Sequence, residues 1–294
     1  MTRRKTLKEL TLKDNFMFGA VMCNENNCKR LLELVLEFPI ERVEVSKEKC
    51  IVYHPEYKGV RLDVYAKDEK NTHYNVEMQA STQAALGKRA RYYHSQIDMD
   101  LLTAGRDYQE LPKTYVIFIC DFDPFGQSKY RYTFRNQCQE VPETWMDDES
   151  ETVFLSTMGK DPESVPNELV KFLKYVRADL QESMEDFEDE FVGTLQKTVH
   201  EVKQSRRMEE RYMLTELLMQ DERRAGREEG RIEGRMEGRT EERKEFILEA
   251  LSELGSVPDF VKEKVMQEKN LDTLKGWMKL AVKSNSVEAF MDRM

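Results

Sequence analysis

The feature that most restricts the fold is a pair of alternating segments around a polar turn, RLDVYAKDEKNTHYNVEMQAS, residues 61–81. Side chains along a β-strand alternate between two faces, so this pattern predicts a two-stranded hairpin. The polar-face positions are Arg61, Asp63 and Tyr65 on the first strand, and Asn75, Glu77 and Gln79 on the second. The opposite face carries Leu62, Val64, Val76 and Met78. If the strands pair through the turn, two carboxylates and a carboxamide converge on one patch.

This convergence has two interpretations. Carboxylates that lack counter-charges repel each other unless a cation lies between them, and oxygen ligands at this spacing suit Mg²⁺ or Mn²⁺ with waters completing the octahedron. A hairpin whose polar face is simply solvated also carries Asp and Glu at alternate positions. The residue pattern alone leaves both interpretations open.

Length and composition restrict the class of protein. The 294 residues suffice for one sizeable core or two modest domains, and 35% of them are charged. The longest apolar run is VIFIC at residues 116–120, far shorter than the roughly 20 residues of a membrane span. The N-terminal MTRRKTLKEL has no apolar signal core behind its basic residues. We therefore expect a cytoplasmic protein with no membrane partner.

Charge and cysteine usage exclude two further classes. The net charge of −10 argues against a protein that holds nucleic acid by bulk electrostatics, although a local basic groove is compatible with it. Five scattered cysteines form no CxxC motif, and the four histidines do not fall beside them at zinc-ligand spacing. We expect reduced structural thiols and no zinc site, and any binding of nucleic acid must come from a defined site.

Hydrophobic periodicity predicts a mixed α/β core followed by helices. Two helical patterns occupy residues 7–38, and a strand-like segment follows before the hairpin. A long helix is predicted for residues 82–110, and a buried strand for YVIFICDFDP at residues 115–124. RYTFRNQC and TVFLST supply two short strands. The expected parts are a core at 1–162, a helical extension at 163–225, a repeat segment at 226–244 and a small helical unit at 245–294.

The repeat segment, GREEGRIEGRMEGRTEERK, has a glycine at every fourth position from 226 to 238. On a helix this period places like charges at i and i+4, which weakens an isolated helix, and each glycine costs roughly 1 kcal/mol relative to alanine. We expect either a flexible tether or a helix that another chain stabilises, and the second option predicts a homo-oligomer formed through the C-terminal helical region. Apolar positions expected to hold the last unit together are Leu248, Leu251, Leu254, Val261, Val265, Leu274 and Trp277.

Several segments together resemble the Rpn family of recombination-promoting nucleases, also described as PD-(D/E)XK nuclease family transposases. These segments are LKDNFMFGAVM, RLDVYAKD, YNVEMQ, KRARYYHSQ, PKTYVIFICDFDPF and the EGR-type repeat with its helical tail. Each motif alone is weak, but their order and spacing are fairly specific, and the resemblance covers almost the whole chain. It implies an α/β, PD-(D/E)XK restriction-endonuclease-like core, a mixed sheet flanked by helices, followed by an α-helical C-terminal region.

The resemblance also implies roles for individual residues. Asp63 matches the metal-binding aspartate, and Glu77 matches the acidic ligand of the (D/E)XK element. Gln79 stands where the wider superfamily usually has lysine; a neutral amide can orient water but adds no positive charge, although glutamine is usual in the Rpn branch. Asp14 matches the acidic residue of the first helix and would complete the catalytic set. A helix-start residue favoured by the helix dipole explains Asp14 equally well.

The helix after the hairpin carries the candidate nucleic-acid contacts Lys88, Arg89 and Tyr92. Arginine and tyrosine near a metal centre can hold phosphates, although an amphipathic helix whose tyrosines pack on the sheet gives the same pattern. We expect at least one tyrosine to pack and Arg89 to contact phosphate. His94 is expected to be a half-exposed structural residue, and His54 and His73 show no partner pattern.

The function implied by the resemblance is metal-dependent hydrolysis of DNA. One or two Mg²⁺ (or Mn²⁺) ions bound by Asp63 and Glu77 would assist the cleavage of phosphodiester bonds by an endonuclease linked to recombination, mobile elements or defence. The alternative is a catalytically weak or inactive nuclease-fold module that binds DNA or self-assembles. Gln79 and the acidic net charge keep this alternative open.

Overall fold

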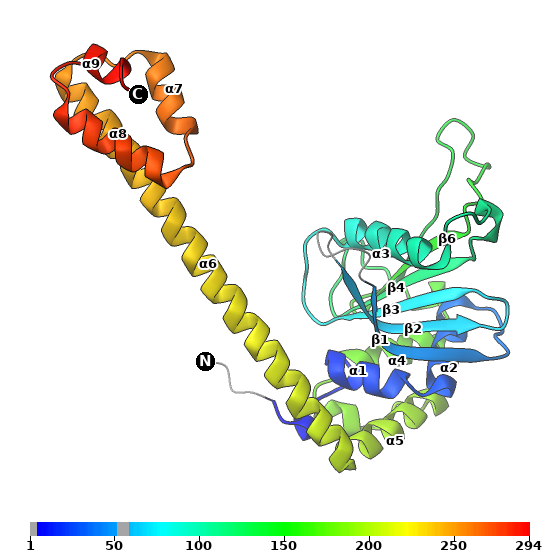
Figure 1. The fold of residues 1–294 in the computed structure, drawn as a ribbon. Helices are drawn as coiled ribbons and strands as arrows, with labels where there is room; N and C mark the ends of the chain where they lie inside the picture. Colours follow the sequence, from blue (N-terminus) through cyan, green and yellow to red (C-terminus); the bar gives the residue numbers. More distant parts are fainter. Residues whose placement is uncertain (1–4, 52–58) are drawn as a thin grey trace. The chain divides into compact units, whose positions relative to one another are not determined.

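The computed structural model describes residues 5–51 and 59–294 of the chain. It divides into two compact units, Met1–Tyr212 and Met213–Met294. The first unit contains the sheet (Figure 1). The second is entirely helical in its regular structure.

A mixed sheet of six strands forms the centre of the first unit. The strands are β1 (Val43–Ile51), β2 (Val60–Asp68), β3 (His73–Gln79), β4 (Thr114–Cys120), β5 (Arg131–Phe134) and β6 (Ser150–Ser156). Their order in the sheet is β1-β2-β3-β4-β6-β5. β1, β2 and β3 pair antiparallel, β4 is parallel to both β3 and β6, and β5 is antiparallel to β6. The expected mixed sheet is confirmed.

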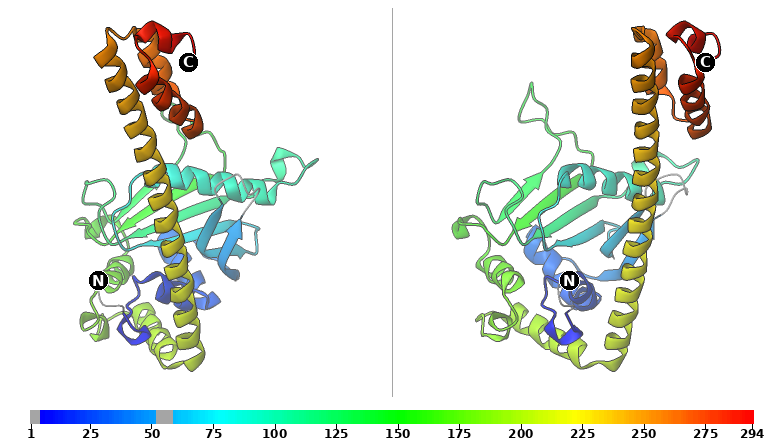
Figure 2. Two further views of the ribbon diagram at one scale, coloured as in Figure 1. Left: turned by 60° about the vertical axis from the view of Figure 1, so that its left-hand side comes forward. Right: turned by 90° about the vertical axis from the view of Figure 1, so that its left-hand side faces the viewer.

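Helices cover both faces of this sheet. They are α1 (Asn15–Met22), α2 (Glu25–Leu36), α3 (Leu86–Leu101), α4 (Asn167–Arg177) and α5 (Glu190–Gln204). α3 lies on one face, and the other four helices lie on the opposite face (Figure 1, Figure 2). α3 is shorter than the helix expected at residues 82–110. Its N-cap Ala85 adopts a positive φ that a right-handed helix excludes, and its C-cap Leu102 has extended backbone.

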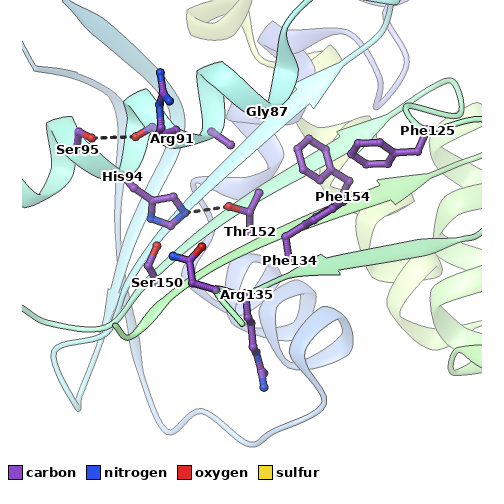
Figure 3. Close-up of a pocket in the computed structure, with 12 residues that line it drawn as sticks. Gly87, Arg91, His94, Ser95, Phe125, Phe134, Arg135, Ser150, Thr152 and Phe154 are labelled. Atoms are coloured by element: carbon purple, nitrogen blue, oxygen red, sulfur yellow. Dashed lines mark hydrogen bonds between the residues drawn. The ribbon is translucent and has the colours of Figure 1, made fainter. Parts of the chain in front are cut away.

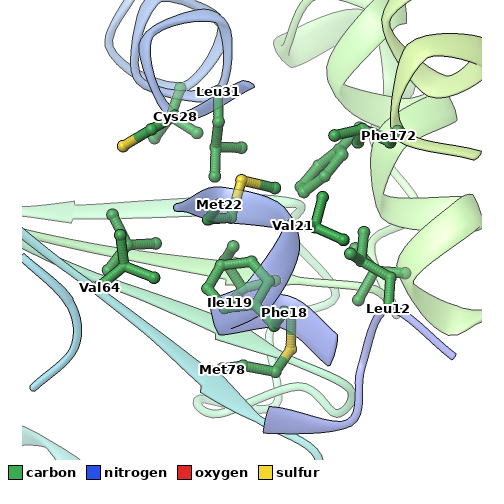
Figure 4. Packing of buried hydrophobic residues seen from close by; sticks show 14 of the residues in the cluster. Leu12, Phe18, Val21, Met22, Cys28, Leu31, Val64, Met78, Ile119 and Phe172 are labelled. Atoms are coloured by element: carbon green, nitrogen blue, oxygen red, sulfur yellow. The ribbon is translucent and has the colours of Figure 1, made fainter. Parts of the chain in front are cut away.

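The two central strands, β3 and β4, are buried along their whole length, so their alternating side chains feed two separate clusters. Val76, Met78 and Ile119 pack under α1 and α2, where Figure 4 shows Met22 and Phe18 among them. α4 and α5 add to the same cluster, so the compact unit continues through Tyr212, beyond the boundary expected at residue 162.

The second cluster lies under α3 and corrects one expectation about the hairpin. Leu62 and Val64 were expected on the same face, yet Leu62 belongs to the cluster under α3 and Val64 to the opposite one. The pairing of β2 with β3 stops at Val64, so the earlier part of β2 pairs only with β1. Pairing with β3 therefore does not fix the direction of the side chains in this part of β2.

The second unit contains most of α6 (Arg206–Leu254) with α7 (Asp259–Gln267), α8 (Leu271–Lys283) and α9 (Val287–Met291). All seven apolar positions expected from the sequence pack in one cluster, around Val261, Val265 and Leu274. The repeat segment is helical as part of α6, with an ion pair between Arg231 and Glu228. Among the described helices, none combines the length and the apolar character that crossing a membrane requires.

A close approach in the loop after β6 allows a test of the fold. A Cβ added to Gly159 would lie 2.3–2.6 Å from ring carbons of the buried Tyr130. The Tyr130 backbone cannot retreat easily, because its N–H donates to Asp161 and its carbonyl accepts from Ser156. We expect Gly159→Ala to lower the free energy of unfolding by about 1–3 kcal/mol, measured by urea denaturation.

The control for this substitution is Gly193→Ala in α5, where an added Cβ meets nothing within 4 Å. Alanine favours a helix more than glycine does, so this variant should be neutral or more stable by up to about 1 kcal/mol. Equal stability of the two variants would contradict the packing of Tyr130 on Gly159.

Candidate active site

Asp63 and Glu77 face each other where the pairing of β2 and β3 ends. The last paired positions are Val64 and Val76. Beyond them, the Asp63 N–H donates to Glu77 Oε1 at 3.2 Å, and the Met78 N–H donates to Asp63 Oδ2 at 3.2 Å. The two carboxylates therefore take the place of backbone carbonyl acceptors, and this exchange brings both acids to one point between the strands.

These carboxylates line a polar cavity of about 210 Å³. Its other lining residues include Asn15, Gln79, Gln83, Arg89 and Tyr93. Glu77 and Gln79 are only 2% and 4% exposed, whereas Asp63 is partly exposed. The cavity thus gathers acidic, amide and guanidinium groups from β2, β3 and the first turns of α3.

Arg89 connects the members of this group. Its Nη1 donates to Gln79 Oε1 at 3.0 Å, and its Nη2 donates to the Tyr93 hydroxyl at 2.7 Å. The same Nη2 lies 3.4 Å from Glu77 Oε2. The guanidinium therefore holds the Gln79 amide in place and brings a positive charge to the buried carboxylate.

The surroundings of Glu77 disfavour its charged form. Burial raises the pKa of Glu77 to about 7, and the neighbouring Asp63 carboxylate adds to the rise. The backbone N–H of Asp63 and the Arg89 guanidinium act in the opposite direction on this pKa. Burial also raises the pKa of Tyr93, with the Glu77 charge as the next cause. Two acids in such surroundings favour a cation as a third component.

The donor set fits a hard divalent cation. Mg²⁺ is commonly held by one or two carboxylates while waters and phosphate oxygens complete its shell. Asp63 and Glu77 supply such carboxylates. Among the described residues, no cluster of three or more His, Cys, Asp or Glu side chains could hold a metal ion, so any ion here relies on these two acids and non-acidic oxygens.

Asp14 is not brought to this cavity. It stands at the start of α1, where its carboxylate accepts from Lys5 Nζ at 2.9 Å and from the Thr11 N–H at 2.8 Å. The next residue, Asn15, lines the cavity instead. Nothing in the sequence pattern distinguishes Asn15 from other polar residues at a helix start, so sequence reasoning missed it.

Of the three candidate nucleic-acid contacts, only Arg89 lines the cavity. Lys88 is exposed on α3, and Tyr92 is partly buried against the cluster under that helix. Tyr93 instead reaches the site, with its hydroxyl 3.4 Å from Glu77 Oε2 and its ring stacked on Phe118 at 6.1 Å. Tyr93 thus packs its ring on the sheet and places its hydroxyl in the cavity.

A family model described as PD-(D/E)XK nuclease family transposase matches residues 12–229. The match covers more than half of the chain and includes every residue that lines the cavity. The chain belongs to this family. Comparisons with curated proteins and with solved structures find no match. Membership supports a nuclease-like function, and PD-(D/E)XK nucleases generally use divalent metal ions.

The histidines that the structure describes do not line the cavity. His94, expected to be half-exposed, is buried between α3 and the sheet, where its ring nitrogens contact the hydroxyls of Thr114 (2.9 Å) and Thr152 (3.1 Å). His73 contacts the Tyr65 hydroxyl across the β2–β3 pair, a partner that the sequence did not indicate. His54 lies outside the described residues.

His94 makes stability depend on pH. Burial lowers its pKa to about 4, whereas an unfolded chain has a histidine pKa near 6.5. The folded state therefore binds fewer protons, so the free energy of unfolding falls as the pH drops from about 6.5 towards 4. Between about pH 7 and pH 5, His94 should account for a loss of about 2 kcal/mol.

His94→Asn, which cannot take up this proton, should show a correspondingly smaller loss of unfolding free energy over the same pH range. Chemical denaturation at both pH values measures the effect. The pKa of His73 is also lowered by burial, to about 4, so a residual slope in the variant is expected. Identical pH slopes for the two proteins would show that folding does not lower the pKa of His94.

Proposed function

We propose that this protein is a divalent-metal-dependent endonuclease that hydrolyses phosphodiester bonds of DNA. The observation that carries the proposal is the meeting of Asp63 and Glu77 across β2 and β3, in a polar cavity that also holds Arg89. Membership in the PD-(D/E)XK nuclease family supports the same chemistry. A link to recombination, mobile elements or defence follows from the family alone and is part of the proposal.

Asp63 and Glu77 are the residues that would hold Mg²⁺ or Mn²⁺. Such an ion supplies Lewis-acid chemistry: it neutralises charge on the phosphate and makes water more acidic. The chain itself fixes the two carboxylates through the backbone N–H groups of Met78 and Asp63. Because these donors belong to the strands, the acids are positioned before substrate arrives.

Arg89 compensates for the missing lysine of the superfamily pattern. Gln79 occupies that position and carries no charge, but its Oε1 accepts from Arg89 at 3.0 Å. A lysine at position 79 would place two positive charges against each other here. We infer that the Arg89 guanidinium, rather than residue 79, stabilises the negative charge that develops on the phosphate. Gln79 and Tyr93 orient this guanidinium.

The first test removes each carboxylate separately. Asp63→Asn and Glu77→Gln keep the shape of the side chain and lose its charge, so plasmid cleavage with Mg²⁺ or Mn²⁺ should slow at least about 10²-fold. A chelator should abolish cleavage by the wild-type protein. The matched control is Glu263→Gln, an exposed residue of α7, which should cleave like the wild type. Equal cleavage by all four proteins would refute the assignment.

The second test separates catalysis from binding at Arg89. Arg89→Ala should lower kcat by about 10²-fold, the range found when one stabilising donor is removed, and Arg89→Lys should recover part of this loss. Lysine keeps the charge but cannot make the forked contacts to Gln79 and Tyr93. The control, Arg106→Ala, removes an exposed arginine that pairs with Glu110. A change in KM with an unchanged kcat would limit Arg89 to binding.

A catalytically weak or inactive module that binds DNA is the second candidate function. The observation that favours it is the uncharged Gln79 at the lysine position. In that case the wild-type protein would bind DNA without cleaving it under either metal ion. Asp63→Asn and Glu77→Gln would then change the affinity for DNA, and no cleavage would be measured for these variants or for the wild type.

Self-association through the C-terminal helical region also forms part of the proposal. Leu214, Leu217 and Leu218 are each more than half exposed, and their spacing places them on one stripe of α6. Ile232 and Met236 within the repeat are about half exposed as well. Exposed apolar side chains at helical spacing favour pairing with another helix, and a second copy of this chain would supply one.

A further inference from the structure

A second cavity, of about 470 Å³, lies between α3 and the strands β5 and β6 (Figure 3). It shares no lining residue with the cavity of Asp63 and Glu77. Its volume is in the range of sites that bind small organic molecules. The proposed catalytic residues do not use this space.

One wall of the second cavity is aromatic. Phe125 and Phe134 are 40% and 46% exposed, with ring centroids 5.0 Å apart. Both meet the buried Phe154 edge-on, at 5.1 Å and 5.7 Å. Figure 3 shows these rings grouped at one end of the cavity. Exposed phenylalanine rings that line a cavity offer a surface on which a flat ring can stack.

The rest of the cavity is polar and has no acidic lining residue. Hydrogen-bonding side chains there are His94, Ser95, Asn136, Ser150 and Thr152. The lining also contains Arg91 and Arg135. Arg135 pairs with Glu151, whereas Arg91 is exposed and forms no ion pair with the residues that the structure describes. Asn136 donates to Asp148, which lies outside the lining, so Arg91 is the group that favours a ligand with a negative charge.

The two cavities border the same helix, α3, and the same row of packed aromatic rings. Tyr93, which reaches the first cavity, stacks on Phe118, and Phe118 stacks on Phe154 at 5.0 Å. On α3, Arg89 lines the first cavity, and its neighbours Ala90 and Arg91 line the second. The first turn of α3, between them, has no acidic residue. A nucleic-acid strand can therefore pass from one cavity to the other without meeting a carboxylate on this turn.

We propose that the second cavity binds an unstacked base of the DNA strand whose phosphodiester lies at Asp63 and Glu77. The base stacks on Phe125 and Phe134, its polar edge faces Asn136 and Ser150, and a flanking phosphate faces Arg91. This inference rests on the proposed function. It makes single-stranded or distorted DNA the preferred substrate, because a base must leave its stack to enter the cavity.

Binding of thymidine 5′-monophosphate to the full chain, measured by calorimetry without metal, tests the cavity directly. Phe134→Ala should weaken binding by about 5- to 150-fold, the effect of losing one stacking ring. Gly87→Leu should do the same by filling the cavity, because an added Cβ at Gly87 faces open space and disturbs no neighbour. Phe260→Ala removes an exposed ring of α7 and should bind like the wild type.

Inorganic phosphate serves as the second probe. It should bind far more weakly than the nucleotide and should be insensitive to Phe134→Ala. Absence of nucleotide binding to the wild-type chain would overturn the proposal, and so would equal affinities of Phe134→Ala, Gly87→Leu and the wild type. If Phe134→Ala destabilises the folded protein, Gly87→Leu still tests the cavity, because it fills the cavity without removing a packed ring.

Cleavage assays on short single-stranded DNA separate this inference from the nuclease proposal. If the wild type cleaves, and Phe134→Ala and Gly87→Leu bind and cleave DNA as it does, the base site is wrong and the nuclease stands. If no protein cleaves but both variants lose the nucleotide, the base site stands and the nuclease is wrong. Oligonucleotides that each carry one abasic residue at a different position can be compared for binding to the Glu77→Gln protein. An abasic residue should weaken binding at one position only. This dependence on position should disappear in the double variant Glu77→Gln with Gly87→Leu.

Discussion

The exchange of hydrogen bonds at the end of the β2–β3 pair determines much of the structure around the site. Two backbone N–H groups, those of Asp63 and Met78, lie where the ladder has stopped, and buried N–H groups require acceptors. The Glu77 and Asp63 carboxylates accept from them. The acids therefore hold the ends of the strands together and are held in return, so any change that moves one strand end also moves the carboxylates.

This arrangement places two negative charges in a buried setting, and α3 supplies the compensation. Arg89 reaches Glu77, Gln79 and Tyr93 from the start of that helix. Burial, with the Asp63 carboxylate as the next cause, still raises the pKa of Glu77 to about 7, so the charged form of this acid is disfavoured. A cation bound at Asp63 and Glu77, as we propose, would favour the charged form of Glu77, in the same direction as Arg89 does.

The parts of this structure that local patterns determine could be predicted, and those that long-range packing determines could not. The alternation at residues 61–81 predicts the hairpin and the meeting of Asp63 with Glu77, because it places both acids on the polar side of their strands. The alternation does not show where the pairing of the strands ends, so the prediction that Leu62 shares a face with Val64 was wrong. Asn15, the Tyr93 hydroxyl and the partner of His73 depend on elements distant in sequence, and the aromatic cavity needs β5, β6 and α3 together.

The acidic character of the chain bears on the proposed contact with DNA. A net charge of −10 disfavours nucleic acid on average, so the proposed contact requires positive groups that face the strand. Arg89 and Arg91 stand two residues apart on α3, one at each cavity. Under the proposal few cations engage the strand, so few counterions would be released on binding, and affinity would depend on stacking and on the proposed metal site more than on bulk charge. Intact duplex, whose bases are already stacked, would gain least from such a surface.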